Sequence, residues 1–235
     1  MAVAGCARAP EATEATSTAT SDTTTSPTIQ DIMKLESFAP LETGTYFIEP
    51  DPDSSTRVLF DVPVEGWSQW TGAVKFGDYG HTAVSIATVT NVVRHGCRDH
   101  HRADPPVGPS VNDLAAALAD LPPFEVTSPP KDVSIYGYSG KHLELAVPDM
   151  PVEGEAEDLL FTDCVDDDLQ SWVARRGGAF YGYTAPGYRE EFWILDAAGT
   201  RLMIAAERSP GSPPGDDAEL QAILDSIRVE TGGTD

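Results

Sequence analysis

The segment from residue 82 to residue 93 constrains the fold more than any other part of the sequence, because it reads as one long β-strand. Successive side chains of a strand point to opposite faces. One face would carry Val84, Ile86, Thr88, Thr90 and Val92, and the other Ala83, Ser85, Ala87 and Val89. Small or apolar residues on both faces predict a central strand that is covered on each side. The chain must therefore build a sheet with a layer above it and a layer below it.

Shorter elements surround this strand. Apolar residues recur at helical spacing from 111 to 121 and again from 220 to 227, and Ser110 with Asp113 is typical of a capping box. Alternating residues and turn clusters predict strands at 46–48, 58–62, 133–135, 143–147, 159–162, 171–174, 179–183, 191–195, 201–206 and 228–230. A loop is expected from 95 to 109. The pattern predicts an α+β fold, a mainly antiparallel β-sheet with two amphipathic helices packed on it.

Composition and hydropathy argue against a nucleic-acid partner and against a membrane-spanning helix. The 235 residues include 15 Lys and Arg against 38 Asp and Glu, a formal net charge of −23. Nucleic-acid binding needs clustered cations, which this chain does not supply, so no nucleic-acid partner is expected. No apolar run reaches the length of a membrane-spanning helix. We expect a single acidic domain over 41–230 and a disordered tail over 231–235.

The beginning of the sequence resembles the end of a bacterial lipoprotein signal. Val3, Ala4, Gly5 and Cys6 fit the lipobox, in which the cysteine receives a diacylglyceryl group. Residues 1–6 would be the remnant of that signal, since its basic and apolar regions are not in the sequence; the alternative is a chance match. Eleven of the 22 residues from 7 to 28 are Ser or Thr, so 7–40 is predicted to be a flexible tether and lead-in. The expected location is the outer face of a bacterial cytoplasmic membrane, with the cell wall or medium as alternatives.

Three segments resemble a recurrent group of actinobacterial secreted or membrane-attached proteins of unknown function. They are 66–97, the run Gly137-Tyr138-Ser139-Gly140-Lys141 and the run Ile223-Leu224-Asp225-Ser226-Ile227-Arg228. The final helix followed by a strand also resembles the end of the PsbP/LpqN-like fold. These resemblances imply an extracytoplasmic α+β domain, and they bring no catalytic residue with them.

Export would place the cysteines in an oxidising compartment, where disulfides persist. With Cys6 lipidated, Cys97 and Cys164 remain as an even pair in an oxidising compartment, which predicts a disulfide. Two separate thiols are the alternative. The bond would hold a His-rich loop (His95, His100, His101) against an acidic loop (Asp163 and 166–168).

Those two loops also contain residue types that can ligate a metal. His95, Asp99, His100 and His101 are ligand types, with His81 upstream, but no second ligand pair of zinc spacing accompanies them. The acidic loop lacks the spacing of a calcium-binding loop. Both are interpreted as solvated loops. Ser139 lies in a run that departs from a serine elbow at Lys141, so a hairpin turn is the better interpretation. We assign no catalytic residue, metal or cofactor.

Aromatic residues are the remaining candidates. Tyrosines in glycine-containing segments can line a pocket at low entropic cost, and the candidate ligand-binding residues are Tyr136, Tyr138, Tyr181, Tyr183 and Tyr188. The sequence thus predicts a lipid-anchored, non-enzymatic module that binds an unknown protein or small molecule of the cell envelope. The alternative is a secreted hydrolase or metal-dependent enzyme with a site built on the loop from His95 to His101.

Overall fold

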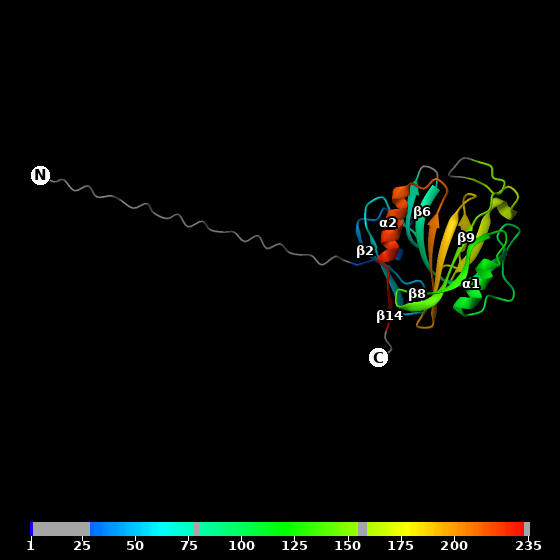
Figure 1. Cartoon of the computed structure of the whole chain (residues 1–235), viewed down its shortest axis with the longest axis horizontal. Helices are drawn as coiled ribbons and strands as arrows, with labels where there is room; N and C mark the ends of the chain where they lie inside the picture. Colours follow the sequence, from blue (N-terminus) through cyan, green and yellow to red (C-terminus); the bar gives the residue numbers. More distant parts are fainter. Residues whose placement is uncertain (2–28, 78–79, 155–158, 233–235) are drawn as a thin grey trace.

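The computed structural model describes residue 1 and residues 29–77, 80–154 and 159–232. Its α+β class is the expected one: a mostly antiparallel β-structure with two α-helices (Figure 1). The strands and helices of the first half are β1 (Gln30–Asp31), η1 (Ile32–Lys34), β2 (Gly44–Ile48), β3 (Thr56–Val62), β4 (Ser68–Gln69), β5 (Gly72–Gly77), β6 (Gly80–His95), β7 (Asp99–Arg102) and α1 (Val111–Ala119). Those of the second half are β8 (Glu125–Ile135), β9 (Tyr138–Ala146), η2 (Val165–Asp167), β10 (Leu169–Ala174), β11 (Phe180–Tyr183), β12 (Arg189–Ala197), β13 (Thr200–Arg208), α2 (Pro214–Asp225) and β14 (Arg228–Thr231).

Strand β6 organises the main sheet. Its 16 residues pair with β13 through the first half and with β10 through the second, so β6 is central as predicted. The strand order is β11-β10-β6-β13-β12-β9-β8, every pair is antiparallel, and the short strands β5 and β7 also pair with β6. A second sheet, β1-β2-β3-β14, contains the one parallel pair among the described strands, β1 with β2.

The two α-helices cover opposite faces of the main sheet (Figure 1). Helix α1 packs with the first hydrophobic cluster, which includes Leu114, Leu143 and Phe192. Helix α2 and the second sheet pack with the other cluster, which includes Trp67, Ile204 and Leu224. The burial of β6 on both faces is explained by this arrangement, because each face packs into a different hydrophobic cluster.

Several expected boundaries differ in the structure. The loop expected over 95–109 contains β7, whose Asp99 pairs with His95. The prediction of a strand at 159–162 is wrong. Leu160 makes a single bridge with Glu153, and the next N–H, that of Phe161, donates to the carbonyl of Asp167. Strand β8 starts eight residues earlier than 133, and its register shifts between Ser128 and Lys131, where two prolines offer no N–H to a ladder.

The folded part begins upstream of the expected residue 41. Ile32 is fully buried in the second cluster, and Asp31 accepts a hydrogen bond from the Met33 N–H at 3.1 Å. Residues 30–40 therefore belong to the domain, and Thr231 pairs with Thr56 in the second sheet. Cys6 and residues 7–28 of the expected tether lie outside the described residues, as do residues 233–235 of the expected tail. In the described part of the chain, neither α-helix has the length and apolar character to span a bilayer.

Candidate functional site

Two glutamates face each other inside the protein. Glu190 of β12 pairs directly with Glu207 of β13, so their side chains lie on the same face of the sheet. Glu190 is 2% exposed and Glu207 is fully buried. Buried carboxyls are costly unless hydrogen bonds or protonation compensate them, so their surroundings decide what they do.

Glu190 is favoured in its neutral form. Burial and the facing carboxylate of Glu207 raise its pKa well above the usual range. Trp172 donates its indole N–H to Glu190 at 3.3 Å, and the Tyr183 hydroxyl hydrogen-bonds the other carboxyl oxygen. Tyr183 also donates to the Ser171 hydroxyl at 3.0 Å. Because a phenol has one proton, a protonated Glu190 that donates to Tyr183 satisfies the whole set.

Glu207 is connected to the surface through a histidine. It accepts hydrogen bonds from the Ser85 hydroxyl at 2.8 Å and from the Tyr181 hydroxyl. The His81 Nε2 atom lies 3.5 Å from Glu207, and the Tyr188 hydroxyl lies 2.8 Å from His81 Nδ1. Burial raises the pKa of Tyr181 well above its usual range, and the neighbouring Glu207 adds to that shift, so its hydroxyl keeps its proton.

A cavity of about 200 Å³ adjoins this network, and we call it the aromatic pocket. Phe38 stacks on Trp70 with ring centroids 5.3 Å apart and meets Phe76 edge-on at 5.7 Å. Phe76 in turn meets His81 at 6.1 Å. The residues that line the pocket are Phe38, Trp70, Val74, Phe76, His81, Tyr181, Gly182 and Thr184. None of these lining residues is Lys or Arg, so only neutral groups and one imidazole face the space.

The walls of the pocket are held in place by the backbone. Phe38 has a φ of 60°, a left-handed conformation that a bulky residue rarely adopts. The Gln69 side chain accepts from the Phe38 N–H at 3.2 Å, and the Gln69 N–H donates to the Ala39 carbonyl at 2.8 Å. These bonds keep the ring of Phe38 over Trp70 although it is 50% exposed.

The tyrosines predicted from the sequence separate into two groups. Tyr181, Tyr183 and Tyr188 come together with the two buried glutamates, and Tyr181 lines the aromatic pocket. Tyr136 and Tyr138 lie on the other face of the sheet. Tyr136 donates to the Leu224 carbonyl at 3.0 Å, and Tyr138 hydrogen-bonds Thr231 at 3.4 Å.

The candidate residues chosen from the sequence do not include the two glutamates or three of the pocket aromatics, Phe38, Trp70 and Phe76. Strand alternation contained a signal for the first two. Glu190 is two residues before Phe192, and Glu207 is two residues after Ala205, so both continue the inward-facing alternation one residue beyond the strands expected at 191–195 and 201–206. A charged residue in an inward position is a functional candidate.

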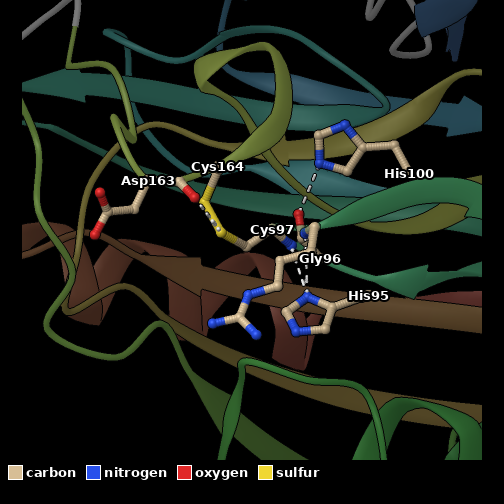
Figure 2. The surroundings of a disulfide bond; sticks show 7 residues. His95, Gly96, Cys97, His100, Asp163 and Cys164 are labelled. Atoms are coloured by element: carbon tan, nitrogen blue, oxygen red, sulfur yellow. Dashed lines mark hydrogen bonds between the residues drawn. A yellow bond between two sulfur atoms is a disulfide. The ribbon is translucent and has the colours of Figure 1, made fainter.

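The disulfide expected from the sequence is present, as Figure 2 shows. The sulfur atoms of Cys97 and Cys164 are bonded, with their Cα atoms 4.5 Å apart. The disulfide joins the two loops as expected. A backbone hydrogen bond beside it, from the Val165 N–H to the Cys97 carbonyl at 2.8 Å, also connects them. The expected pairing of imidazoles with the acidic loop is not observed among the described side chains. His95 Nδ1 accepts from the Cys97 N–H at 3.2 Å, and His100 Nε2 bonds the Gly96 carbonyl at 2.9 Å (Figure 2).

The remaining candidates of these loops are also engaged locally. His101 pairs with Asp99 at 2.7 Å on the surface. Desolvation and the nearby Arg98 lower the pKa of His95 below its usual value. Within the described residues, the four candidates of the His-rich loop do not form a cluster of metal-ligand atoms.

Comparison with protein-family models, with curated proteins and with solved structures found no match for this chain. The functional argument therefore rests on the geometry of the site.

Proposed function

We propose that the chain is a non-enzymatic binding module that holds a small organic cation, such as an alkylammonium group, in the aromatic pocket. The observation that carries the proposal is the combination of three aromatic walls with a fully buried glutamate behind His81 and Tyr181. Aromatic faces attract cations through the ring quadrupole, and they do so most strongly where water is excluded.

The exposure of the walls supports this proposal. Phe38 and Phe76 are 50% and 57% exposed, although each contributes a large apolar ring. An occupant that covers these rings would remove apolar surface from water. The formal net charge of −23 favours a cationic occupant over an anionic one.

The size and polarity of the pocket limit the occupant. A volume of about 200 Å³ lies below the usual range of roughly 300–1,000 Å³ for drug-sized ligands, which suits a single small headgroup. His81, Tyr181 and Thr184 are the polar lining side chains, and the Tyr181 hydroxyl is already bound to Glu207. The pocket thus offers recognition and little free acid–base capacity.

The alternative function, an enzyme with a site on the loop from His95 to His101, has less support. Each imidazole of that loop is hydrogen-bonded to its own loop, to the Cys97 N–H, the Gly96 carbonyl or the Asp99 carboxylate. A binding role at the aromatic pocket explains more of the buried polar groups, so we favour it.

The location completes the proposal. We place the module on the outer face of a bacterial cytoplasmic membrane, anchored by lipid on Cys6, with a PsbP/LpqN-like fold. The disulfide, which persists in oxidising compartments, supports an extracytoplasmic location. Expression of the full gene in a bacterial host with labelled palmitate tests the anchor. Label should enter the wild type and not Cys6→Ala, and an unlabelled wild type would remove the anchor from the proposal.

Calorimetry with choline tests the pocket, with 3,3-dimethylbutanol as its uncharged analogue. Choline should bind with 1:1 stoichiometry and the uncharged analogue at least about tenfold more weakly, which corresponds to about 1.4 kcal/mol. Trp70→Ala should abolish the difference. Phe180→Ala is the matched control, since Phe180 is an exposed ring of β11 that lines a different hollow with Arg102. Equal binding of both ligands would contradict the cation, and no binding would contradict the site.

A further inference from the structure

A group of potential metal ligands lies on the face of β12 opposite to Glu190. Glu144 of β9 pairs directly with Glu191 of β12, and His142 pairs with Trp193. Within the described residues, His142, Glu144 and Glu191 form the one group of three metal-ligand side chains whose ligand atoms lie within 4.8 Å of one another. His142 is 6% exposed, and the two glutamates are half-buried.

The charges of this group are not balanced. Like charges directly opposite each other destabilise an antiparallel pair. Arg208 lies 3.6 Å from Glu191 but is shared with Asp217, which it contacts at 3.0 Å. In the described part of the chain, the carboxylate of Glu144 has neither an ion pair nor a side-chain hydrogen bond. A bound cation between the two carboxylates would supply the missing positive charge.

The histidine is oriented for this purpose. Its Nε2 atom lies 2.7 Å from a carboxylate oxygen of Glu191, and its ring packs on Trp193 with centroids 5.3 Å apart. The other ring nitrogen, Nδ1, is buried and has no hydrogen-bond partner among the described residues. No second bond therefore fixes the proton on Nε2, and the Nε2 lone pair becomes available to a metal once the bond to Glu191 is exchanged.

We propose that His142, Glu144 and Glu191 form a binding site for a divalent metal ion of the zinc type. One imidazole nitrogen and two carboxylate oxygens are a ligand set that Zn²⁺ accepts, with metal–ligand distances of about 2.0–2.2 Å. Such distances require Nε2 and the Glu191 oxygen to separate from 2.7 Å to about 3.4 Å, a shift within the reach of side-chain rotation. Imidazole favours zinc, nickel or copper over magnesium and calcium.

The backbone supports the geometry, because all three ligands come from two paired strands in the middle of a ladder. The site is independent of the aromatic pocket, since Glu190 and Glu191 point to opposite faces of β12. Failure of one proposal leaves the other untouched.

Calorimetric titration of the purified full chain with Zn²⁺ alone tests the proposal. The wild type should bind one ion, and His142→Gln and Glu144→Gln should each weaken binding at least about tenfold. His101→Gln is the matched control, because His101 also bonds a carboxylate at 2.7 Å but belongs to no group of three metal-ligand side chains among the described residues. Retention of binding in His101→Gln is expected.

Trp193 provides a second readout. Its contact with His142 places it beside the metal, so Ni²⁺ should quench tryptophan emission in the wild type and not in His142→Gln. Glu144 is half-buried, and Glu144→Gln keeps the inference testable if His142→Gln does not fold. Absence of stoichiometric binding, equal binding in all variants, or loss in His101→Gln alone would each overturn the site.

Discussion

Glu190 and Glu191 are adjacent in the sequence, and each directly faces another glutamate across a strand pair. Glu190 faces Glu207 inside the first hydrophobic cluster, and Glu191 faces Glu144 on the other side of the sheet. The inner pair is surrounded by neutral hydrogen-bonding groups: two tyrosines, a serine and an indole. The outer pair has one histidine and a shared arginine.

The difference shows how the surroundings of a glutamate pair decide which positive charge neutralises it. Inside the core, where a free cation would itself be desolvated, a proton on Glu190 is the cheapest neutralising charge. At the half-buried outer pair, a hydrated ion can enter from solvent and exchange its water for carboxylate oxygens. The same two-residue motif therefore leads to a proton-holding site on one face and to a proposed metal site on the other.

Loss of the disulfide should produce the largest effect, and locally it should loosen the strands beside the inner pair first. Cys97 and Cys164 belong to the cluster that contains Tyr183, and their separation of 67 residues predicts about 4 kcal/mol of stabilisation in the chain-entropy model. Denaturant unfolding of Cys97→Ala/Cys164→Ala should show that loss. Hydrogen exchange should accelerate in β10 and β11, while the β9–β12 ladder stays protected. The control is Cys6→Ala, which keeps both Cys97 and Cys164. Two titratable thiols in this variant, after expression in an oxidising compartment, would contradict the bond.

Removal of the phenol that bonds Glu190 should be the next largest effect. Tyr183→Phe leaves the carboxyl of Glu190 and the hydroxyl of Ser171 without their shared partner, which is expected to cost about 1–3 kcal/mol. Tyr138→Phe is the matched control on the other face, where the hydroxyl makes one long bond of 3.4 Å. Its cost should stay below about 0.5 kcal/mol in the same unfolding assay. Equal costs would contradict the role of the Tyr183 hydroxyl as the shared partner of Glu190 and Ser171.

Much of the fold follows from sequence patterns that have a single strong period. The central strand β6, the capping box at Ser110, the hairpin of β12 and β13, and helix α1 are found where they are expected. Helix α2 is also present, but it starts at Pro214 and ends at Asp225, before Ile227 of the expected apolar stripe. The short elements were harder to predict. Strand β4 has two residues and pairs with the adjacent β5, and β7 has four residues and pairs with the adjacent β6 across a register shift. Both are too short for their own composition to show a period.

The site was less predictable because it depends on cross-strand register. The tyrosines at 181, 183 and 188 were candidates, but their partners Glu190 and Glu207 are known only when β12 and β13 are aligned. A shift of one residue would move Glu207 to the opposite face. Phe38 was unpredictable for another reason, since it reaches Trp70 from a segment that was interpreted as part of the tether.

The pH dependence of stability tests the protonated state of Glu190 in the inner pair. The raised pKa of Glu190 means that the folded state keeps a proton that the unfolded chain loses above about pH 4.5, its ordinary value. The contribution of Glu190 to stability is therefore complete below that pH and falls as pH rises toward the folded-state pKa. Glu190→Gln removes this loss, so its melting temperature relative to wild type should rise by a few degrees between pH 5 and pH 8. Glu36→Gln, an exposed control, should give a flat difference.

The smallest expected effect concerns the outer pair in the absence of metal. Glu144→Gln removes one of two facing negative charges, which should stabilise the chelated protein by about 0.2–1 kcal/mol at low salt. About 1 M salt should erase the gain, because the screening length falls to about 3 Å. Glu49→Gln, an exposed carboxylate elsewhere, controls for the change in net charge. With Zn²⁺ in excess the order should reverse, because the wild type gains stability by mass action when the ion binds its folded state and the variant does not. A variant that remains the more stable protein in saturating Zn²⁺ would mean that the facing carboxylates repel each other without serving a metal.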